Sequence, residues 1–122
     1  MADGMKGWPR LLRAWRVSYK GLAWALREEE AFRIEFVLFV LLAPLALWLG
    51  DSGLERAVLL LSLLLVLLVE LLNTAEWAVE AAIDRIGKEH HPLSGLAKDL
   101  GSAAVHISLL QVPVIWGLIL FG

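Results

Sequence analysis

The sequence predicts an all-α integral membrane protein with three membrane-spanning helices and an amphipathic surface helix at its amino end. Three observations lead to this fold class. The 122 residues are 59% hydrophobic with a mean hydropathy of +0.70, well above a soluble average. Three long apolar runs follow one another, and a basic, tryptophan-containing segment precedes them. The length suits one domain, residues 1–122, and the absence of cysteine excludes disulfides and thiolate metal sites.

Residues 8–27 are predicted to form the surface helix. Apolar residues recur there at spacings of three and four, which marks one helical face; they include Leu11, Trp15 and Tyr19. Most of the basic residues lie on the other face, and Pro9 suits a first helical turn. This pattern is typical of a helix lying in the membrane interface. Whether the helix is only an anchor or also contributes to a site stays open at this point.

The membrane helices are predicted at about residues 31–50, 56–86 and 97–121. The first apolar run, 36–49, is short for a span of about 20 residues, so its helix is expected to begin near Ala31. The second run reaches spanning length only if Glu70 and Asn73 lie within the bilayer. The third contains no Asp, Glu, Lys or Arg from residue 100 onward. All three runs are therefore expected to span.

The basic residues predict the orientation. Ten of the eleven lie in the amino-terminal segment or between residues 85 and 98, and only Arg56 lies in the first loop. By the positive-inside rule the amino terminus and the second loop are cytoplasmic, and the carboxyl terminus faces outward. The first apolar run starts too late, behind too many charges, for a cleavable signal peptide to be expected.

Polar residues form one stripe along the second membrane helix. At about 100° per residue, Glu70 and Glu76 lie near +60° and −60° from Asn73, while Glu80 and Asp84 lie within about 20° of it. A carboxylate at the bilayer centre costs on the order of 2.5–3.5 kcal/mol. Glu70 is therefore predicted to be functional. The alternative is that the stripe only marks where a long helix leaves the membrane.

A second acidic cluster, Glu28–Glu30, precedes the first span at the same predicted level. Inward-facing carboxylates suit Mg²⁺, which usually arrives with substrate phosphates. Lys98 is a point charge suited to phosphate, and His106 in the third span is expected to be a helix-packing hydrogen bonder. A turn before the third span is predicted at Pro92, Ser94 and Gly95. Together these residues predict an acidic, metal-binding site at the cytoplasmic interface.

Several motifs resemble the prokaryotic diacylglycerol kinase family: "VELLNTA", "EAAIDRIG", "LSGLAKDLGSAAV", "EEAFRIE" and "YKGL". They extend over essentially the whole chain. The resemblance implies a homotrimeric bundle whose subunits each carry three spans and a surface helix. It also implies transfer of the γ-phosphoryl group of MgATP to a lipid hydroxyl, at sites between subunits.

The resemblance further implies roles for individual residues. Glu70 is similar to the family's catalytic base, and Glu29 and Glu80 to its metal ligands. The implied nucleotide-binding residues are Arg10, Glu29, Asn73, Glu80, Asp84, Glu89, His90, His91, Lys98 and Asp99. The implied lipid-substrate residues are Arg10, Trp15, Ser18, Tyr19, Glu35, Trp48, Arg56, Glu70, Ser102 and Trp116.

The chain departs from the family pattern in two places. Val17 stands where a nucleotide-contacting tyrosine is expected. The segment between Asn73 and Asp84 is three residues longer, so Glu76 competes with Glu80 for the second metal role. Three residues preserve the helical face but shift the site by about 4.5 Å, part of which a helix bulge could absorb.

The expected function is phosphorylation of diacylglycerol to phosphatidic acid at the cytoplasmic face of a bacterial inner membrane. The expected partners are MgATP, the lipid and further copies of the chain, with no nucleic acid. Mg²⁺ is the expected cofactor, and other divalent cations are able to replace it. Two alternatives stay open: an undecaprenol kinase, and a non-catalytic membrane protein with a drifted nucleotide or metal site.

Overall fold

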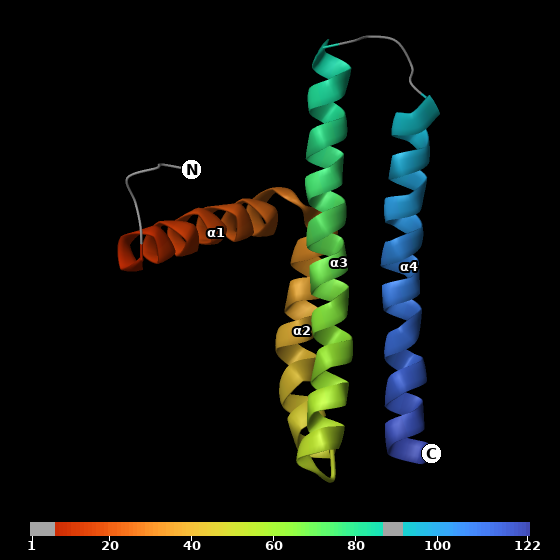
Figure 1. The fold of residues 1–122 in the computed structure, drawn as a ribbon. Coiled ribbons are helices and arrows are strands. Elements are labelled where there is room, and N and C mark those ends of the chain that lie inside the picture. Colours follow the sequence, from red (N-terminus) through yellow and green to blue (C-terminus); the bar gives the residue numbers. More distant parts are fainter. Residues whose placement is uncertain (1–6, 87–91) are drawn as a thin grey trace.

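The computed structural model describes residues 7–86 and 92–122, which form four helices and no strand. They are α1 (Trp8–Glu28), α2 (Glu30–Leu49), α3 (Gly53–Ile86) and α4 (Pro92–Phe121). The last three are long and apolar enough to cross a membrane. They run side by side as a bundle, whereas α1 leaves the bundle at a steep angle (Figure 1). The predicted fold class, three spanning helices and an amino-terminal surface helix, is confirmed.

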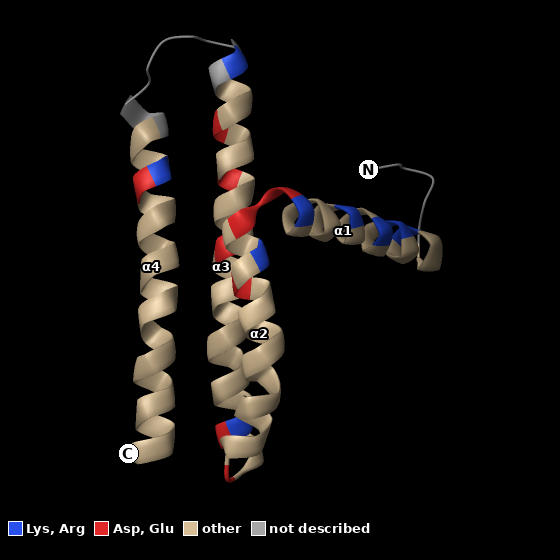
Figure 2. Cartoon of the chain, turned by 180° about the vertical axis from the view of Figure 1, so that it is seen from behind, with Lys and Arg blue, Asp and Glu red and all other residues tan. Residues whose placement is uncertain are grey.

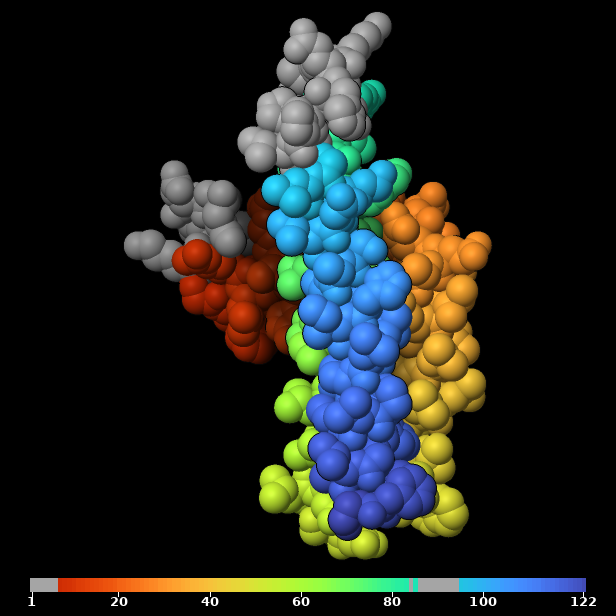
Figure 3. Space-filling view, turned by 90° about the vertical axis from the view of Figure 1, so that its right-hand side faces the viewer, coloured from red at the N-terminus to blue at the C-terminus, as the bar shows by residue number. Residues whose placement is uncertain are grey.

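Helix α3 is the centre of the bundle, because it packs against both α2 and α4. The space-filling view shows α4 lying over α3 along the length of the bundle (Figure 3). The core contains Ala46, Leu59 and Leu63, which are all buried. The small side chain of Ala46 allows the backbones of α2 and α3 to approach closely, as is usual between membrane helices.

A tight turn joins α2 to α3. The hydroxyl of Ser52 accepts a hydrogen bond from the backbone N–H of Glu55 (3.1 Å), whose carboxylate accepts one from the N–H of Asp51 (3.0 Å). This is close to the reciprocal capping box that starts many helices. Arg56 Nε donates to the carbonyl of Gly50 (3.1 Å), and a Cβ at Gly50 would lie 2.6 Å from Arg56 Cγ. The turn therefore requires glycine at this close approach.

The junction between α1 and α2 bends at Glu29, whose backbone is extended (φ −107°, ψ 109°). Arg33 stabilises the bend, because its Nη1 donates to the carbonyls of Leu26 (3.2 Å) and Arg27 (2.9 Å) at the end of α1. A cation is favourable at a helix carboxyl end. The bend places the acidic junction at the height of the acidic residues on α3 (Figure 2).

One local prediction, the turn before the third span, is wrong. Helix α4 begins at Pro92, so Ser94 and Gly95 belong to its first turn instead of forming a separate turn. Proline is favoured at the first helical position, because the N–H that it lacks has no partner there. Helix α3 is α-helical throughout Gly53–Ile86, so it contains no bulge that would shorten the distance along the axis between Asn73 and Asp84.

Candidate functional site

Glu70 lies inside the bundle, with 6% of its surface exposed. Its carboxyl group is hydrogen-bonded to that of Glu35, which α2 brings against α3. Two carboxyl groups can hydrogen bond to each other only when one of them carries a proton. The second oxygen of Glu35, Oε1, is buried and has no hydrogen-bond partner. The pair can therefore hold a proton and still offer an unsatisfied acceptor.

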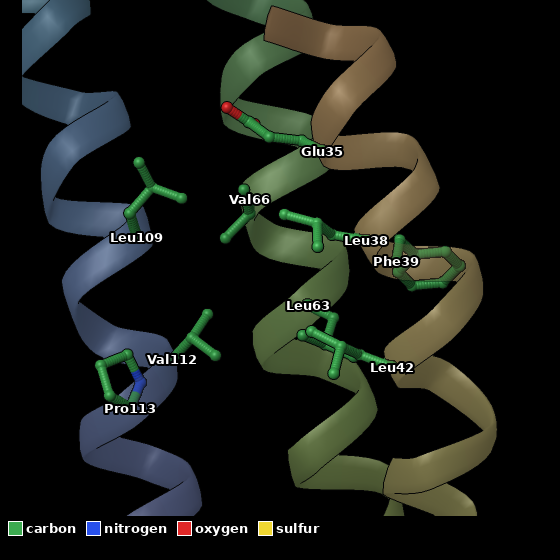
Figure 4. Close-up of a pocket in the computed structure, with 9 residues that line it drawn as sticks. All are labelled: Glu35, Leu38, Phe39, Leu42, Leu63, Val66, Leu109, Val112 and Pro113. Atoms are coloured by element: carbon green, nitrogen blue, oxygen red, sulfur yellow. The ribbon is translucent and has the colours of Figure 1, made fainter.

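An apolar cavity of about 190 Å³ extends from this pair toward the far end of the bundle. Figure 4 shows side chains of α2, α3 and α4 around it, with Glu35 at one end. Glu35 is its only ionisable lining residue; the others include Phe39, Leu63 and Pro113. The Glu35–Glu70 pair thus stands where an apolar cavity meets the polar stripe.

Asn73 and Glu76 face helix α4 at Gly101. A Cβ at Gly101 would collide with Asn73 Oδ1 and lie 2.7 Å from Glu76 Oε2. These residues also line a common groove of about 320 Å³ between the two helices. Glycine at position 101 therefore leaves room for the polar side chains of α3, and the Glu76 carboxylate packs against the α4 backbone.

Glu80, Trp77 and Lys98 line a pocket of about 170 Å³ one turn further along. Lys98 Nζ lies 5.3 Å from the centroid of the Trp77 ring, within the range of a cation–π contact. Glu80 Oε2 is buried and has no hydrogen-bond partner. This end of the stripe thus combines a cation with an unsatisfied carboxylate oxygen, a combination suited to phosphate and a divalent cation.

The straight α3 helix sets the depth of each group in the membrane. At ~1.5 Å per residue, Glu70 lies about 21 Å from Arg56 along the axis, Glu76 about 30 Å and Glu80 about 36 Å. The hydrocarbon core of a bilayer is about 30 Å thick. With Arg56 at one edge of the core, Glu70 lies within it and Glu80 beyond the opposite edge.

The acidic junction offers one partly buried carboxylate. Glu29 is half-buried, whereas Glu28 and Glu30 are exposed. Among the side chains that the structure describes, which do not include Asp84, no three Asp, Glu or His residues gather into a metal-binding group. The described carboxylates therefore lie at one level without closing a cation site among themselves.

Several predicted site residues are exposed on α4 or lie outside the described part of the chain. Lys98, Asp99 and Ser102 are exposed on α4. Asp84 belongs to α3, but its side chain lies outside the described part. The predictions for Glu89, His90 and His91 also fall outside the described residues.

The predicted lipid residues of α1 are not brought to Glu70. Arg10, Trp15, Ser18 and Tyr19 are all exposed, and α1 carries them away from its own bundle (Figure 1). A separate surface groove on α1 is lined partly by Arg16 and Lys20. Within a single chain, the predicted lipid residues of α1 and Glu70 therefore lie at separate sites.

Three other predicted lipid residues, Trp48, Arg56 and Trp116, lie toward the opposite end of the bundle. Trp48 is in the last turn of α2, and Arg56 binds the α2–α3 turn. Trp116 Nε1 donates to the hydroxyl of Ser62 (2.9 Å), so its polar group serves contact between helices.

The prediction that His106 hydrogen bonds to a neighbouring helix is wrong. Its Nδ1 is paired with the carbonyl of Ser102 one turn earlier on α4 (2.8 Å), and the side chain is exposed. A carbonyl on the same helix face is within reach of a side chain four residues later, so no second helix is needed.

Trp77 is the site residue that the sequence interpretation did not single out. It lies about 40° from Asn73 on the helical wheel, inside the same stripe as the carboxylates. Because its side chain is apolar, the polar pattern did not include it. Its angular position on the helical wheel was the one signal in the sequence that could have placed Trp77 in the site.

Comparison with known proteins agrees with the motifs in the sequence. The model of the prokaryotic diacylglycerol kinase family matches residues 16–120. A diacylglycerol kinase of Escherichia coli is 43% identical over all of this chain and 98% of its own length. The diacylglycerol kinase of Haemophilus influenzae is 46% identical over 94% of this chain and 95% of its own length. The diacylglycerol kinase of Pseudomonas aeruginosa is 45% identical over 98% of this chain and 94% of its own length.

Proposed function

This chain belongs to the prokaryotic diacylglycerol kinase family, and we propose that it transfers the γ-phosphoryl group of MgATP to diacylglycerol, forming phosphatidic acid. Similarity over the whole chain to enzymes named diacylglycerol kinases supports this lipid over undecaprenol. The structural observation that carries the proposal is the arrangement along α3. A buried carboxylate at lipid depth is followed, toward the end of the helix, by an unsatisfied carboxylate and a lysine.

Glu70 is proposed as the general base for the lipid hydroxyl. A base must lie within hydrogen-bond reach of the proton that it accepts, and the hydroxyl of a diacylglycerol sits near the membrane interface. Glu70 lies inside the hydrocarbon core but toward its cytoplasmic side. Its hydrogen bond to Glu35 fixes the orientation of the carboxyl group, and the cavity beside Glu35 is lined otherwise by apolar side chains.

Glu29 and Glu80 are the proposed ligands of Mg²⁺, which neutralises phosphate charge during phosphoryl transfer when it is bound. The buried, unpaired Oε2 of Glu80 fits this role, since an oxygen in that state lacks the partner that burial calls for. Glu29 is the half-buried member of the acidic junction. Glu76 is the alternative ligand, closer to Glu70 by about 6 Å along the helix. Its contact with Gly101 makes it the less available carboxylate.

The phosphates are proposed to contact Lys98 and Arg10. Lys98 is exposed at the same end of the bundle as Glu80 and lines its pocket. The remaining proposed nucleotide contacts are Asn73, Asp84, Glu89, His90, His91 and Asp99. Phosphoryl transfer depends on positioning and charge neutralisation more than on covalent chemistry, so these groups need only hold the nucleotide in line with the lipid hydroxyl.

A homotrimer is proposed, with each site completed by a neighbouring subunit. Two features of the single chain support this. Helix α1 presents Arg10, Trp15, Ser18 and Tyr19 away from its own Glu70, and many large apolar side chains on α2–α4 are exposed. Exposed apolar surface on membrane helices faces lipid or another subunit. A second copy could bring α1 to the site.

The proposed location is the bacterial inner membrane, with the amino terminus and the α3–α4 loop in the cytoplasm. Basic residues concentrate at that end of the bundle and on α1 (Figure 2). This charge distribution follows the positive-inside rule, and it places the nucleotide end of α3 where ATP is available.

One experiment tests the proposal. The purified chain is incubated in mixed micelles with Mg²⁺, ATP labelled at the γ-phosphorus, diacylglycerol and undecaprenol. The expected result is labelled phosphatidic acid. If labelled undecaprenyl phosphate forms instead, undecaprenol is the substrate and not diacylglycerol. If no lipid becomes labelled, the chain is better described as a membrane protein without catalytic activity.

A pair of matched variants tests the metal role. Glu29→Gln is expected to raise the Mg²⁺ concentration that is needed for half-maximal rate by at least about tenfold. Glu30→Gln, the exposed neighbour, is the control and is expected to leave that concentration unchanged. Equal effects of the two variants would show a general loss of negative charge at the junction.

A further inference from the structure

Trp77 of α3 and Lys98 of α4 are in contact across the interface between the two helices. Trp77 is 52% exposed, and the ammonium group of Lys98 lies 5.3 Å from its ring centroid. The two residues come from different helices and line one pocket with Glu80. The contact therefore involves the proposed phosphate-binding lysine and lies in the same pocket as the proposed metal ligand, Glu80.

A lysine and a glutamate that share a small pocket would ordinarily attract each other into an ion pair. In this pocket, however, the described partner of the Lys98 ammonium is the face of Trp77. The buried Oε2 of Glu80 has no hydrogen-bond partner, either Lys98 or another group. The aromatic ring thus gives the cation a favourable position that leaves the carboxylate oxygen free.

A tryptophan at this level could also serve simply as an interfacial membrane anchor, a common role for the residue. An anchor needs lipid headgroups around the ring and gains nothing specific from a neighbouring lysine. Trp77 instead has a cation on its face and a carboxylate in the same pocket. The arrangement fits a residue that controls where the cation rests.

We propose that Trp77 is a positioning residue that holds Lys98 away from Glu80. The carboxylate of Glu80 then stays available to a divalent cation, and the ammonium of Lys98 stays available to phosphate. This inference rests on the proposed function and deepens it, since it names what keeps the two charges of the nucleotide site from neutralising each other.

The test is a double-mutant cycle read out by metal binding. Mn²⁺ alone is titrated into the purified full chain in detergent micelles, and free Mn²⁺ is measured by electron paramagnetic resonance. The four proteins are the parent chain, Trp77→Leu, Lys98→Met and the double variant. Such a cycle isolates the coupling between two residues in contact.

The expected result is that Trp77→Leu raises the Kd for Mn²⁺ about two- to fivefold while Lys98 is present, the factor that corresponds to an exposed cation–π contact. In the Lys98→Met background the same change is expected to have no effect, because no ammonium remains to pair with Glu80. Trp77→Phe keeps an aromatic face and is expected to lie between the parent chain and Trp77→Leu. This graded variant also covers the case in which Trp77→Leu fails to fold.

Two results would overturn the inference alone: equal Mn²⁺ binding by the parent chain and Trp77→Leu, or the same loss with and without Lys98. In either case kinase activity of the parent chain would leave the proposed function standing. A parent chain that takes up no Mn²⁺ would overturn the inference together with the proposed metal site. Kinetics give a second readout. Trp77→Leu is expected to raise the KM for MgATP and leave the KM for the lipid unchanged.

Discussion

The two ends of the α2–α4 bundle differ in whether their buried polar groups have hydrogen-bond partners. At the end of the bundle that contains the carboxyl end of α4, the buried polar groups bind one another. The Ser62 hydroxyl donates to the carbonyl of Leu59 (2.6 Å) and accepts a hydrogen bond from Trp116. Gln111 Nε2 donates to the carbonyls of Ser62 (2.9 Å) and Ser108 (2.6 Å). Only Gln111 Oε1 remains buried and unpaired there among the described groups. The bonds from Gln111 to the Ser62 carbonyl and from Trp116 to the Ser62 hydroxyl join α3 to α4, and each of the other two lies within one helix.

In the half of the bundle nearer the α3–α4 connection, the buried oxygens without a hydrogen-bond partner among the described groups belong to carboxylates, Glu35 Oε1 and Glu80 Oε2. Burying a polar group without a partner costs free energy, and the cost is larger for a charged group than for an amide. A structural role is therefore enough to explain the first end of the bundle. At the second end, the ligands of the proposed function would satisfy the carboxylates, and four sets of substitutions test this contrast.

The largest expected effect is that of Glu70→Gln. Removal of a general base typically costs a factor of about 10²–10⁴ in rate, and the neutral amide can still hydrogen bond to Glu35. Turnover should be lost within that range, while MgATP binding stays nearly intact. Steady-state kinetics with diacylglycerol, together with nucleotide binding, check this. Unchanged turnover would remove Glu70 from the role of base.

The next effect is expected at the lower carboxylates. Glu80→Gln should weaken the apparent affinity for Mg²⁺ by about 10–100-fold, because it removes a proposed ligand. Glu76→Gln is the matched comparison and should change that affinity less than about threefold. Rates measured over a Mg²⁺ series decide between the two residues, and a reversed order of effects would assign the metal to Glu76.

Gly101→Ala tests the contact where the stripe meets α4. The added Cβ would meet Asn73 Oδ1 and Glu76 Oε2, the ends of two side chains that can shift, so the expected cost relative to the control is near the low end of the about 1–3 kcal/mol typical of overpacking. Thermal unfolding in detergent should show a destabilised protein. Gly117→Ala, on the same helix but with no atom within 4 Å of the new Cβ, is the control. Equal stability of the two variants would show that α3 and α4 separate easily at this level.

The smallest effect is expected at the opposite end of the bundle. Ser62→Ala removes the acceptor for the Trp116 indole, and such hydrogen bonds between membrane helices contribute about 0.6 kcal/mol on average. Unfolding of Ser62→Ala, Trp116→Phe and the double variant should give a coupling energy of this size, with kinase activity retained. Loss of activity without loss of stability would show that this end of the bundle has a functional role, and the two ends would then not differ in the proposed way.

Much of the molecule could be predicted from the sequence, because its strongest signals are local. Hydropathy sets which segments span, and the periodicity of residues 8–27 sets the surface helix. The angular position of Glu70, Asn73 and Glu76 also followed from helix geometry alone. The family motifs supplied the expected chemistry, and the comparisons confirmed the family.

The sequence did not predict the contacts between helices, because these depend on which faces of the helices pack together. The partner of Glu70 is Glu35, thirty-five positions earlier, and only the packing of α2 on α3 brings the two together. The start of α4 at Pro92 was misjudged because proline and glycine signal both turns and helix starts.

The sequence by itself determined the membrane class, the helices and the single polar stripe, since these depend on composition and on 3.6-residue periodicity. The tertiary structure decided how that stripe is divided. Glu70 pairs with α2, Glu76 packs on Gly101, and Glu80 shares a pocket with Lys98 under the Trp77 ring. Contacts between helices depend on the facing side chains of both, and no pattern within one segment contains that information.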